Sequence, residues 1–198
     1  MTFPTNDWHN RDKETSPLDF PNLPYLFDEE SGFKLSQSNA ILRYLGRKFK
    51  LDGSSEAERI RIDLTEQQVQ DCWSSLIREI YSPTASTESL QAHRDNVVPD
   101  QLAALSRFLG SKDFFSGGSL SYADFKAYEW LYITRLFAPD AFAKHANLAA
   151  FLTRIESLPK VAAFIASDKY IAWPVSAPFA KWGNSVSNPE LDPLNRKD

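Results

Sequence analysis

The chain of 198 residues contains a single cysteine, Cys72, and only three histidines, at positions 9, 93 and 145. One cysteine excludes an internal disulfide framework and every metal site built from several thiolates, and it is typical of a protein kept in a reducing compartment. Histidines this far apart in the sequence form no metal-binding motif. We therefore expect neither a disulfide nor a bound metal.

An excess of positive charge is also absent. The 22 Lys and Arg residues are outnumbered by 26 Asp and Glu residues, which gives a formal net charge of −4. Nucleic-acid-binding proteins usually carry a basic excess or stripe, so we expect no nucleic-acid partner. No segment approaches the ~18 apolar residues that a membrane-spanning helix needs. The N-terminal segment has the composition of neither a signal nor a transit peptide, so the sequence predicts a soluble cytoplasmic protein without membrane attachment.

Apolar residues make up 42% of the chain, which is enough for a packed core at this length. Residues 22–27 form a short run rich in apolar and aromatic side chains, and residues 33–36 alternate between apolar and polar. A polar turn that contains Gly32 joins them, and this pattern is typical of a β-hairpin. Pro24 limits the pairing of the first strand, because proline has no N–H to donate.

A short helix is predicted directly after the hairpin. Ser38 is a favourable N-cap residue, and Ile41, Leu42 and Leu45 have helical spacing. The segment 51–54 contains an aspartate, a glycine and a serine and interrupts the apolar pattern. We place a domain boundary there.

From Ser55 onward the sequence predicts only helices. Ser55 and Glu58 match a capping box at the start of a long helix that ends near Tyr81. Pro99 is expected to kink or restart the helix that follows. The other predicted helices cover residues 88–110, residues 122–137 behind a cap at Ser121, residues 147–157 and residues 159–167.

These elements predict an α+β protein with two domains. Residues 1–50 would form a β-hairpin plus one helix, and residues 55–184 an all-α domain. The polar tail 185–198 contains two prolines and is predicted to be disordered.

Two segments, DFPNLPYL at 19–26 and QSNAILRY at 37–44, together resemble the cytosolic glutathione S-transferases of the mu class. The similarity extends over about residues 8–184. The resemblance implies that residues 1–50 are an incomplete thioredoxin-like domain, followed by an all-helical domain, in a homodimer. It also implies conjugation of reduced glutathione, as co-substrate, to small apolar electrophiles through the thiolate, with no further cofactor and no metal.

The first strand–helix–strand unit of that family has no counterpart in this sequence. In the family this unit carries the tyrosine that activates the glutathione thiol, and here no tyrosine precedes Tyr25. We therefore assign no catalytic residue. An alternative stays open, namely a catalytically impaired relative that binds ligands or has a structural role.

The resemblance further implies a glutathione site. Its residues would be Trp8, Lys13, Asn22, Leu23, Pro24, Gln37, Ser38 and Asp71. The helix that begins at Ser38 would hold the γ-glutamyl carboxylate, since a helix N-terminus presents free N–H groups and a partial positive charge. The bond before Pro24 would be cis, and Asp71 would reach the neighbouring site across a dimer. Arg11 is an alternative to Lys13, and the residues alone favour Ser38 as a simple helix cap.

A second-substrate site and a dimer interface follow from the same resemblance. The second-substrate site would contain Tyr81, Trp73, Ser176 and Ala177, with the Tyr81 hydroxyl donating to the electrophile. The dimer interface would contain Phe20, Arg43, Arg47, Asp63 and Glu66. Phe20 would insert into a pocket on the helical domain of the partner, and a buried aromatic anchor of this type usually dominates an interface. The alternative for the charged residues is a solvated surface position worth ~0–1 kcal/mol.

Overall fold

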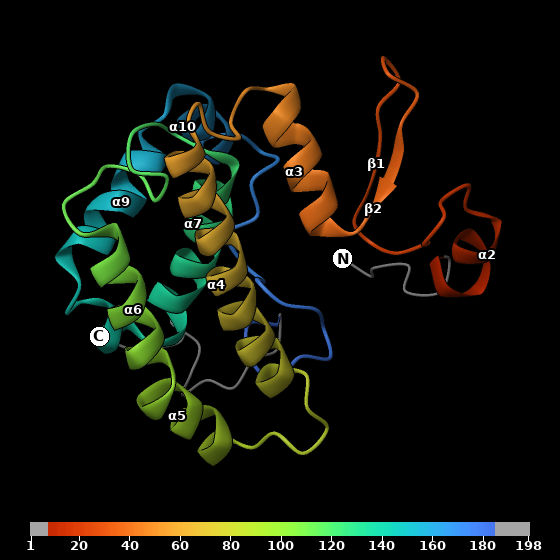
Figure 1. Cartoon of the computed structure of the whole chain (residues 1–198). Coiled ribbons are helices and arrows are strands. Elements are labelled where there is room, and N and C mark those ends of the chain that lie inside the picture. The colour runs from red at the N-terminus through yellow and green to blue at the C-terminus, as the bar shows by residue number, and fades with distance from the viewer. Residues whose placement is uncertain (1–7, 185–198) are drawn as a thin grey trace. The chain divides into compact units, whose positions relative to one another are not determined.

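The structure is a computed structural model that describes residues 8–184 (Figure 1). Its internal contacts divide the chain into two compact units, one that ends at Asp52 and one that begins at Gly53. We call them unit 1 and unit 2. Among the described residues, unit 1 contains both strands and unit 2 contains only helices, which confirms the predicted α+β organisation.

Unit 1 is a β-hairpin followed by a helix. The strands β1 (Tyr25–Phe27) and β2 (Lys34–Ser36) pair antiparallel, and α3 (Ser38–Lys48) follows directly. Two short helical turns precede the hairpin, namely η1 (Trp8–Asp12) and α2 (Lys13–Thr15). These residues show no apolar periodicity in the sequence.

A polar cluster ties the hairpin turn to α3. The Lys48 Nζ lies 2.5 Å from Asp28 Oδ2 and 3.0 Å from Glu30 Oε2, and the Tyr44 hydroxyl donates to the same Asp28 oxygen. The Lys48 ammonium and the Tyr44 hydroxyl hold the pKa of Asp28 well below its usual range. Leu18 is the only buried apolar side chain among the described residues of unit 1. Ion pairs and hydrogen bonds therefore provide much of the interaction between the hairpin and α3.

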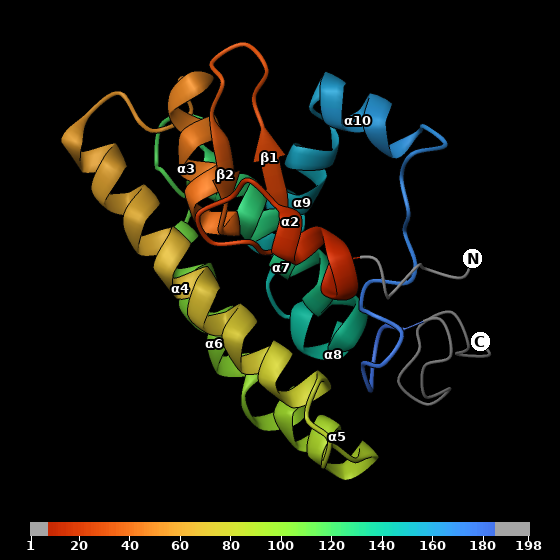
Figure 2. The same cartoon turned by 90° about the vertical axis from the view of Figure 1, so that its right-hand side faces the viewer.

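Unit 2 is a helical bundle in which α7 packs against α4 and α9 (Figure 2). Its helices are α4 (Glu56–Ile80), α5 (Thr87–Asn96), α6 (Val98–Leu109), α7 (Tyr122–Phe137), α8 (Pro139–Phe142), α9 (Ala146–Glu156) and α10 (Pro159–Ile165). The predicted stretch 88–110 is two helices that separate at Val97, with Pro99 in the first turn of α6, where a missing N–H costs nothing. Within residues 8–184, no helix combines the length and the apolar character that crossing a membrane requires.

Side chains cap the two longest helices. The Ser55 hydroxyl accepts from the Glu58 N–H at 3.2 Å, as the capping box predicts, and the Glu58 carboxylate accepts from the N–H and hydroxyl of Ser54. At the start of α7, the buried Asp124 accepts from the Ser121 N–H at 2.8 Å and from the Phe115 N–H at 2.7 Å. Burial raises the pKa of Asp124, and these donors oppose that rise.

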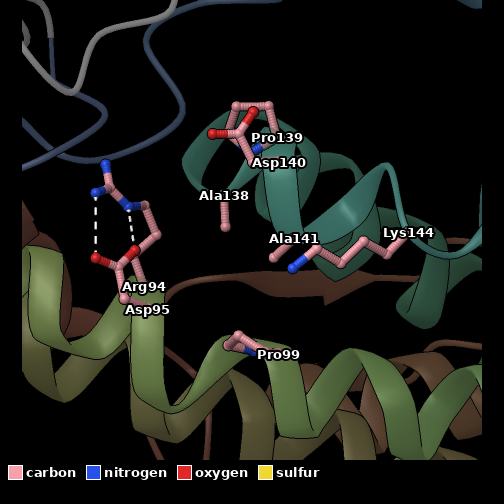
Figure 3. A pocket seen from close by; sticks show the side chains of 8 residues that line it. All are labelled: Arg94, Asp95, Pro99, Ala138, Pro139, Asp140, Ala141 and Lys144. Atoms are coloured by element: carbon pink, nitrogen blue, oxygen red, sulfur yellow. Dashed lines mark hydrogen bonds and ion pairs between the residues drawn. The ribbon is translucent and has the colours of Figure 1, made fainter.

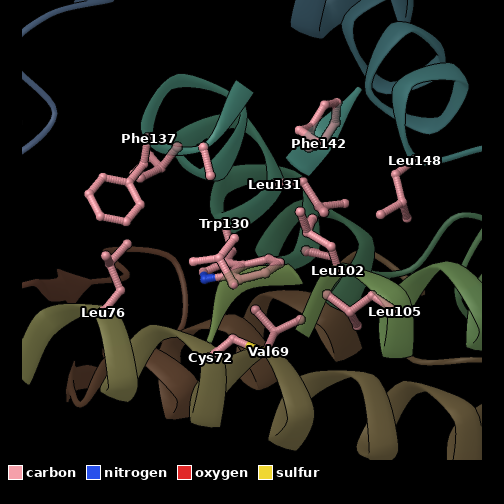
Figure 4. Close-up of a cluster of buried hydrophobic side chains, with 14 of the residues drawn as sticks. Val69, Cys72, Leu76, Leu102, Leu105, Trp130, Leu131, Phe137, Phe142 and Leu148 are labelled. Carbon is pink, nitrogen blue, oxygen red and sulfur yellow. The ribbon is translucent and has the colours of Figure 1, made fainter. Parts of the chain in front are cut away.

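The apolar core of unit 2 forms where α4, α6, α7 and α9 meet (Figure 4). Trp182, which follows the last helix, is fully buried in it and lies edge-on to Phe137 with ring centroids 4.9 Å apart. Burying one Leu- or Phe-sized side chain contributes about 2 kcal/mol. Fully buried members of the core include Val69, Cys72, Leu102, Trp130, Leu131, Leu148, Phe151, Leu152 and Ile155. The fold of unit 2 therefore depends on its core, unlike that of unit 1.

Candidate functional site

The register of the hairpin gathers most of the predicted glutathione-binding residues at one end of unit 1. Tyr25 lies opposite Ser36 in the antiparallel pair, so the chain before β1 runs beside the chain after β2. The Leu23–Pro24 bond directly precedes β1, and residues 37 and 38 directly follow β2. The Leu23–Pro24 turn before β1 and the start of α3 therefore lie next to each other.

The Leu23–Pro24 peptide bond is cis, as the resemblance implies. The backbone N–H of Leu23 donates to the Asn22 Oδ1 at 2.9 Å, and the side chain of Leu23 is about half exposed. A ligand acceptor that takes the Leu23 N–H would compete with the amide oxygen of Asn22, the residue that the resemblance also assigns to this site.

Gln37, and not Ser38, occupies the N-cap position of α3. Its backbone has φ of 69°, its C=O accepts from the Ile41 N–H at 3.0 Å, and Ser38 is the first helical residue. The prediction that Ser38 caps this helix is therefore wrong, because the positive φ of Gln37 starts the helix one residue earlier. A positive φ at a residue other than glycine costs on the order of 1–3 kcal/mol and is typical of ligand sites.

The start of α3 has the features that an anion site needs. Gln37 and Ser38 are both exposed, and no acidic residue stands in the first turn of the helix. The first N–H groups of a helix have no acceptor inside it, and they carry the positive end of its dipole. Ser38, as the first residue of α3, adds a hydroxyl at this end of the helix, so a carboxylate placed there would meet several donors at once.

Trp8 lies beside β1, where its ring stacks on that of Tyr25. Its ring centroid lies 5.9 Å from that of Tyr25, with 20° between the planes. Lys13 is exposed on α2, and Arg11, its alternative, forms an ion pair with Asp12 at 2.8 Å. The structure therefore brings Trp8 to β1 and leaves Lys13 on an exposed helical turn.

The remaining predicted glutathione residue, Asp71, lies in unit 2 on an exposed position of α4. Its neighbour Cys72 is fully buried, and burial raises the pKa of that thiol. A buried thiol with a raised pKa is a poor nucleophile. Cys72 is therefore a core residue and takes no part in the site.

Three of the four predicted second-substrate residues meet at the end of α4. The Tyr81 hydroxyl accepts from the Ala177 N–H at 3.0 Å, and the Lys181 N–H donates to the Ile80 C=O at 2.7 Å. These bonds fasten residues 173–184, which we call the strap, to α4. The structure thus brings Ser176 and Ala177 to Tyr81, whereas Trp73 is partly buried and packs against the core.

Two strap residues in this region escaped the sequence analysis. The Phe179 ring is 74% exposed and stands edge-on to Tyr81 with centroids 5.2 Å apart. Gly183 has φ of 78°, and its C=O accepts from the N–H groups of Val175 and Ser176. A Cβ on Gly183 would lie 2.7 Å from the Ser176 Oγ, so only glycine fits there. The glycine itself was the available signal, while nothing in the sequence pointed to Phe179.

The predicted dimer residues differ in exposure. Phe20 is 71% exposed, and Arg43, Arg47 and Asp63 are exposed as well. Glu66 is fully buried, and its carboxylate accepts from the Tyr122 hydroxyl at 2.7 Å. Glu66 therefore does not present the surface charge that a contact with a second copy requires.

A hollow of about 270 Å³ opens on unit 2 between α4 and α6. Its side chains are mostly apolar, and Leu64 at its rim is 55% exposed. The residues that line it are Leu64, Thr65, Gln68, Ala104, Leu105 and Phe108.

A larger hollow of about 450 Å³ lies where α5, α6 and α8 meet (Figure 3). Arg94 pairs with Asp95 at 2.8 Å, and Lys144 and Asp140 add one charge of each sign. None of its lining residues belongs to the predicted sites. Across residues 8–184, no three His, Cys, Asp or Glu side chains gather in a way that could hold a metal ion.

Comparisons with known proteins agree with this geometry. Residues 3–47 match the family model of the glutathione S-transferase N-terminal domain, and residues 70–168 match that of the C-terminal domain. The chain is 42% identical to "Glutathione S-transferase Mu 1" of Mus musculus over 182 residues, which is 92% of this chain and 81% of the relative. It is 43% identical to "Glutathione S-transferase Mu 3" of Homo sapiens over 167 residues, which is 84% of this chain and 72% of the relative.

Solved structures give the same result. The crystal structure of the transferase Blo t 8 superposes with a TM-score of 0.79 at 32% identity, over 87% of this chain and 81% of that one. A pi-class glutathione S-transferase of Onchocerca volvulus superposes with a TM-score of 0.78 at 26% identity, over 90% of this chain and 84% of that one.

Proposed function

Because the chain belongs to the glutathione S-transferase family, we propose that it conjugates reduced glutathione to small electrophiles. The observation that carries the proposal is the end of the hairpin, where the cis Leu23–Pro24 turn adjoins the start of α3. The exposed backbone at Leu23 would pair with the cysteinyl part of glutathione. The N–H groups and hydroxyl at Ser38 would hold the γ-glutamyl carboxylate.

In the reaction, the glutathione sulfur attacks an electrophilic carbon, a carbon–sulfur bond forms, and the leaving group departs with its electron pair. The thiol proton goes to solvent. A free thiol with a pKa of ~8.5 is mostly protonated at neutral pH, so any interaction that stabilises the thiolate raises the rate. The contribution that we assign to unit 1 is binding and orientation of the tripeptide. The reaction needs no metal and no cofactor besides glutathione as co-substrate.

We assign the electrophile to the surface between Tyr81 and the strap. The Tyr81 oxygen accepts from the Ala177 N–H, which leaves the phenol proton to be donated to the electrophile. Such a bond stabilises negative charge that develops on the electrophile during attack. Ser176 and Ala177 contribute small side chains to this surface, next to the exposed ring of Phe179.

We also propose that the protein acts as a homodimer. Phe20, with its largely exposed ring, would enter the apolar hollow between α4 and α6 of a second copy. Arg43 and Arg47 would approach Asp63 of that copy, and Asp71 would approach its glutathione site. The burial of the lone Cys72 suits the reducing cytoplasm, which we propose as the location.

Titration calorimetry with glutathione, together with turnover of 1-chloro-2,4-dinitrobenzene, tests the proposed function. We expect binding and turnover by the parent protein. The substitution Ser38→Ala should weaken glutathione binding about tenfold, since a hydrogen bond to a charged group contributes about 1.5 kcal/mol or more. Ser157→Ala, at the end of α9, is the matched control and should bind like the parent.

The two readouts separate the possible failures. No heat at millimolar glutathione would overturn the proposed site. Binding without turnover would overturn catalysis and favour a protein that only holds the tripeptide. Equal weakening by both serine substitutions would show that the start of α3 has no special role.

A further inference from the structure

A cavity of about 440 Å³ lies on unit 2, with α7 on one side and α10 on the other. We call it the tyrosine pocket. Small-molecule sites usually measure about 300–1,000 Å³, so the cavity can hold a compact organic ligand. The residues that line it are Tyr128, Tyr132, Arg135, Glu156, Ala162, Ile165, Ala166 and Tyr170.

The two walls of the tyrosine pocket differ in shape. On the α7 side, the rings of Tyr128 and Tyr132 lie 6.1 Å apart with 34° between their planes. On the α10 side, Ala162 and Ala166 present only methyl groups. Aromatic faces on one side and small apolar groups on the other form a slot that fits a flat ring.

The phenols of the pocket are hydrogen-bond donors at neutral pH. Burial raises the pKa of Tyr128 to about 12, and burial together with Tyr132 raises the pKa of Tyr170. The Tyr128 hydroxyl donates to Glu156 at 3.3 Å, and Tyr132 and Tyr170 bring two further phenols to the lining. Each of these two phenols has one proton that a ligand acceptor can take.

The charges in the pocket balance. Arg135 lies 3.3 Å from the Glu156 carboxylate, and its guanidinium also stands over the Tyr132 ring at 5.2 Å. One cation and one anion in contact give no net attraction for a charged ligand. An anion would meet the Glu156 carboxylate, and a cation would meet Arg135.

From this arrangement we propose that the tyrosine pocket binds a flat, uncharged aromatic molecule that carries a hydrogen-bond acceptor. The ring lies between the tyrosines of α7 and the alanines of α10, and its acceptor takes a proton from the hydroxyl of Tyr132 or Tyr170. None of these residues belongs to the proposed glutathione, second-substrate or dimer sites. The inference therefore stands apart from the proposed function.

The probe is 7-methoxycoumarin, which is flat and uncharged and carries a carbonyl acceptor, and binding is measured by titration calorimetry on the full chain. Ala162→Trp fills the slot and should weaken binding at least tenfold. Ala163→Trp adds the same bulk at the next, exposed position of α10, which does not line the pocket, and should bind like the parent. Coumarin-3-carboxylate should bind more weakly than the uncharged probe.

Circular dichroism and thermal melting of both variants confirm that they fold. The proposal is overturned if the parent does not bind the probe, or if the two tryptophan variants behave alike. Equal or tighter binding of the carboxylate would overturn the assignment to uncharged ligands.

Discussion

The Tyr81 hydroxyl accepts the backbone N–H of Ala177 at 3.0 Å, which joins residues 96 positions apart in the sequence. One phenol thereby fastens the strap to α4 and faces the surface where we place the electrophile. The same side chain can thus serve in two ways, as an anchor for the strap and as a donor to the bound substrate.

Replacing Tyr81 by Phe should affect both roles. Losing one neutral hydrogen bond costs about 1 kcal/mol, so turnover of 1-chloro-2,4-dinitrobenzene should fall about fivefold. The Ala177 amide loses its acceptor and should exchange with solvent deuterium faster, while amides of α6 remain as protected as in the parent. Mass-spectrometric hydrogen exchange reports the second effect. Unchanged exchange at Ala177 would contradict the anchoring role.

Phe20→Ser should dissociate the proposed dimer. The substitution removes the aromatic anchor, and truncating an anchor of this type typically costs 2 kcal/mol or more of binding energy. Phe49→Ser is the matched control, since Phe49 is also an exposed phenylalanine of unit 1. Analytical ultracentrifugation should show monomers for the first variant and dimers for the second. A monomeric parent, or dimers in both variants, would contradict the interface.

Asp124→Ala should destabilise unit 2 by about 2–4 kcal/mol. The carboxylate satisfies the buried N–H groups of Phe115 and Ser121, and a buried donor left without an acceptor costs about 1–3 kcal/mol. Asp140→Ala removes an exposed carboxylate and should change the stability by less than ~0.5 kcal/mol. Urea unfolding measures both. Equal effects of the two substitutions would show that the α7 cap is not a source of stability.

His93 should make unit 2 less stable in mild acid. Burial lowers the pKa of His93, with Glu79 opposing, and its Nε2 has no hydrogen-bond partner in the part of the chain that is described. The unfolded chain therefore binds a proton below pH ~6.5 that the folded protein resists, and stability falls as the pH drops from there.

Urea midpoints at pH 7, 6 and 5 check this effect. His93→Leu should flatten the decline between pH 6.5 and 5. His145→Gln tests a second histidine whose pKa is also lowered by burial, and the part of the decline that is due to His93 should remain in that variant. An equal decline in His93→Leu and the parent would contradict the prediction.

Local sequence patterns predicted most elements of the fold. Alternation around Gly32 gave the hairpin, apolar spacing after Ser55 gave the long helix, and Pro99 marked the division between α5 and α6. Each of these signals acts within a few residues, which is the range over which helix, strand and turn preferences operate. The family resemblance added the cis bond before Pro24.

Features that depend on distant contacts or unusual backbone geometry were not predictable. Ser38 is a better cap by residue type than Gln37, and the positive φ of Gln37 leaves no mark in the sequence. A carboxylate on a long helix is usually solvated, so the burial of Glu66 against Tyr122 was unexpected. The bond between Tyr81 and Ala177 joins segments that only the folded chain brings together.

The burial of Trp182 affects how the protein is made. A chain grows from its N-terminus, so all the helices from α4 to α10 emerge from the ribosome before the indole that packs against Phe137. Until that residue is synthesised, the nascent bundle exposes an apolar gap to solvent. Unit 2 should therefore complete its folding late in translation, and ribosome stalling shortly before residue 182 should leave an intermediate prone to aggregate.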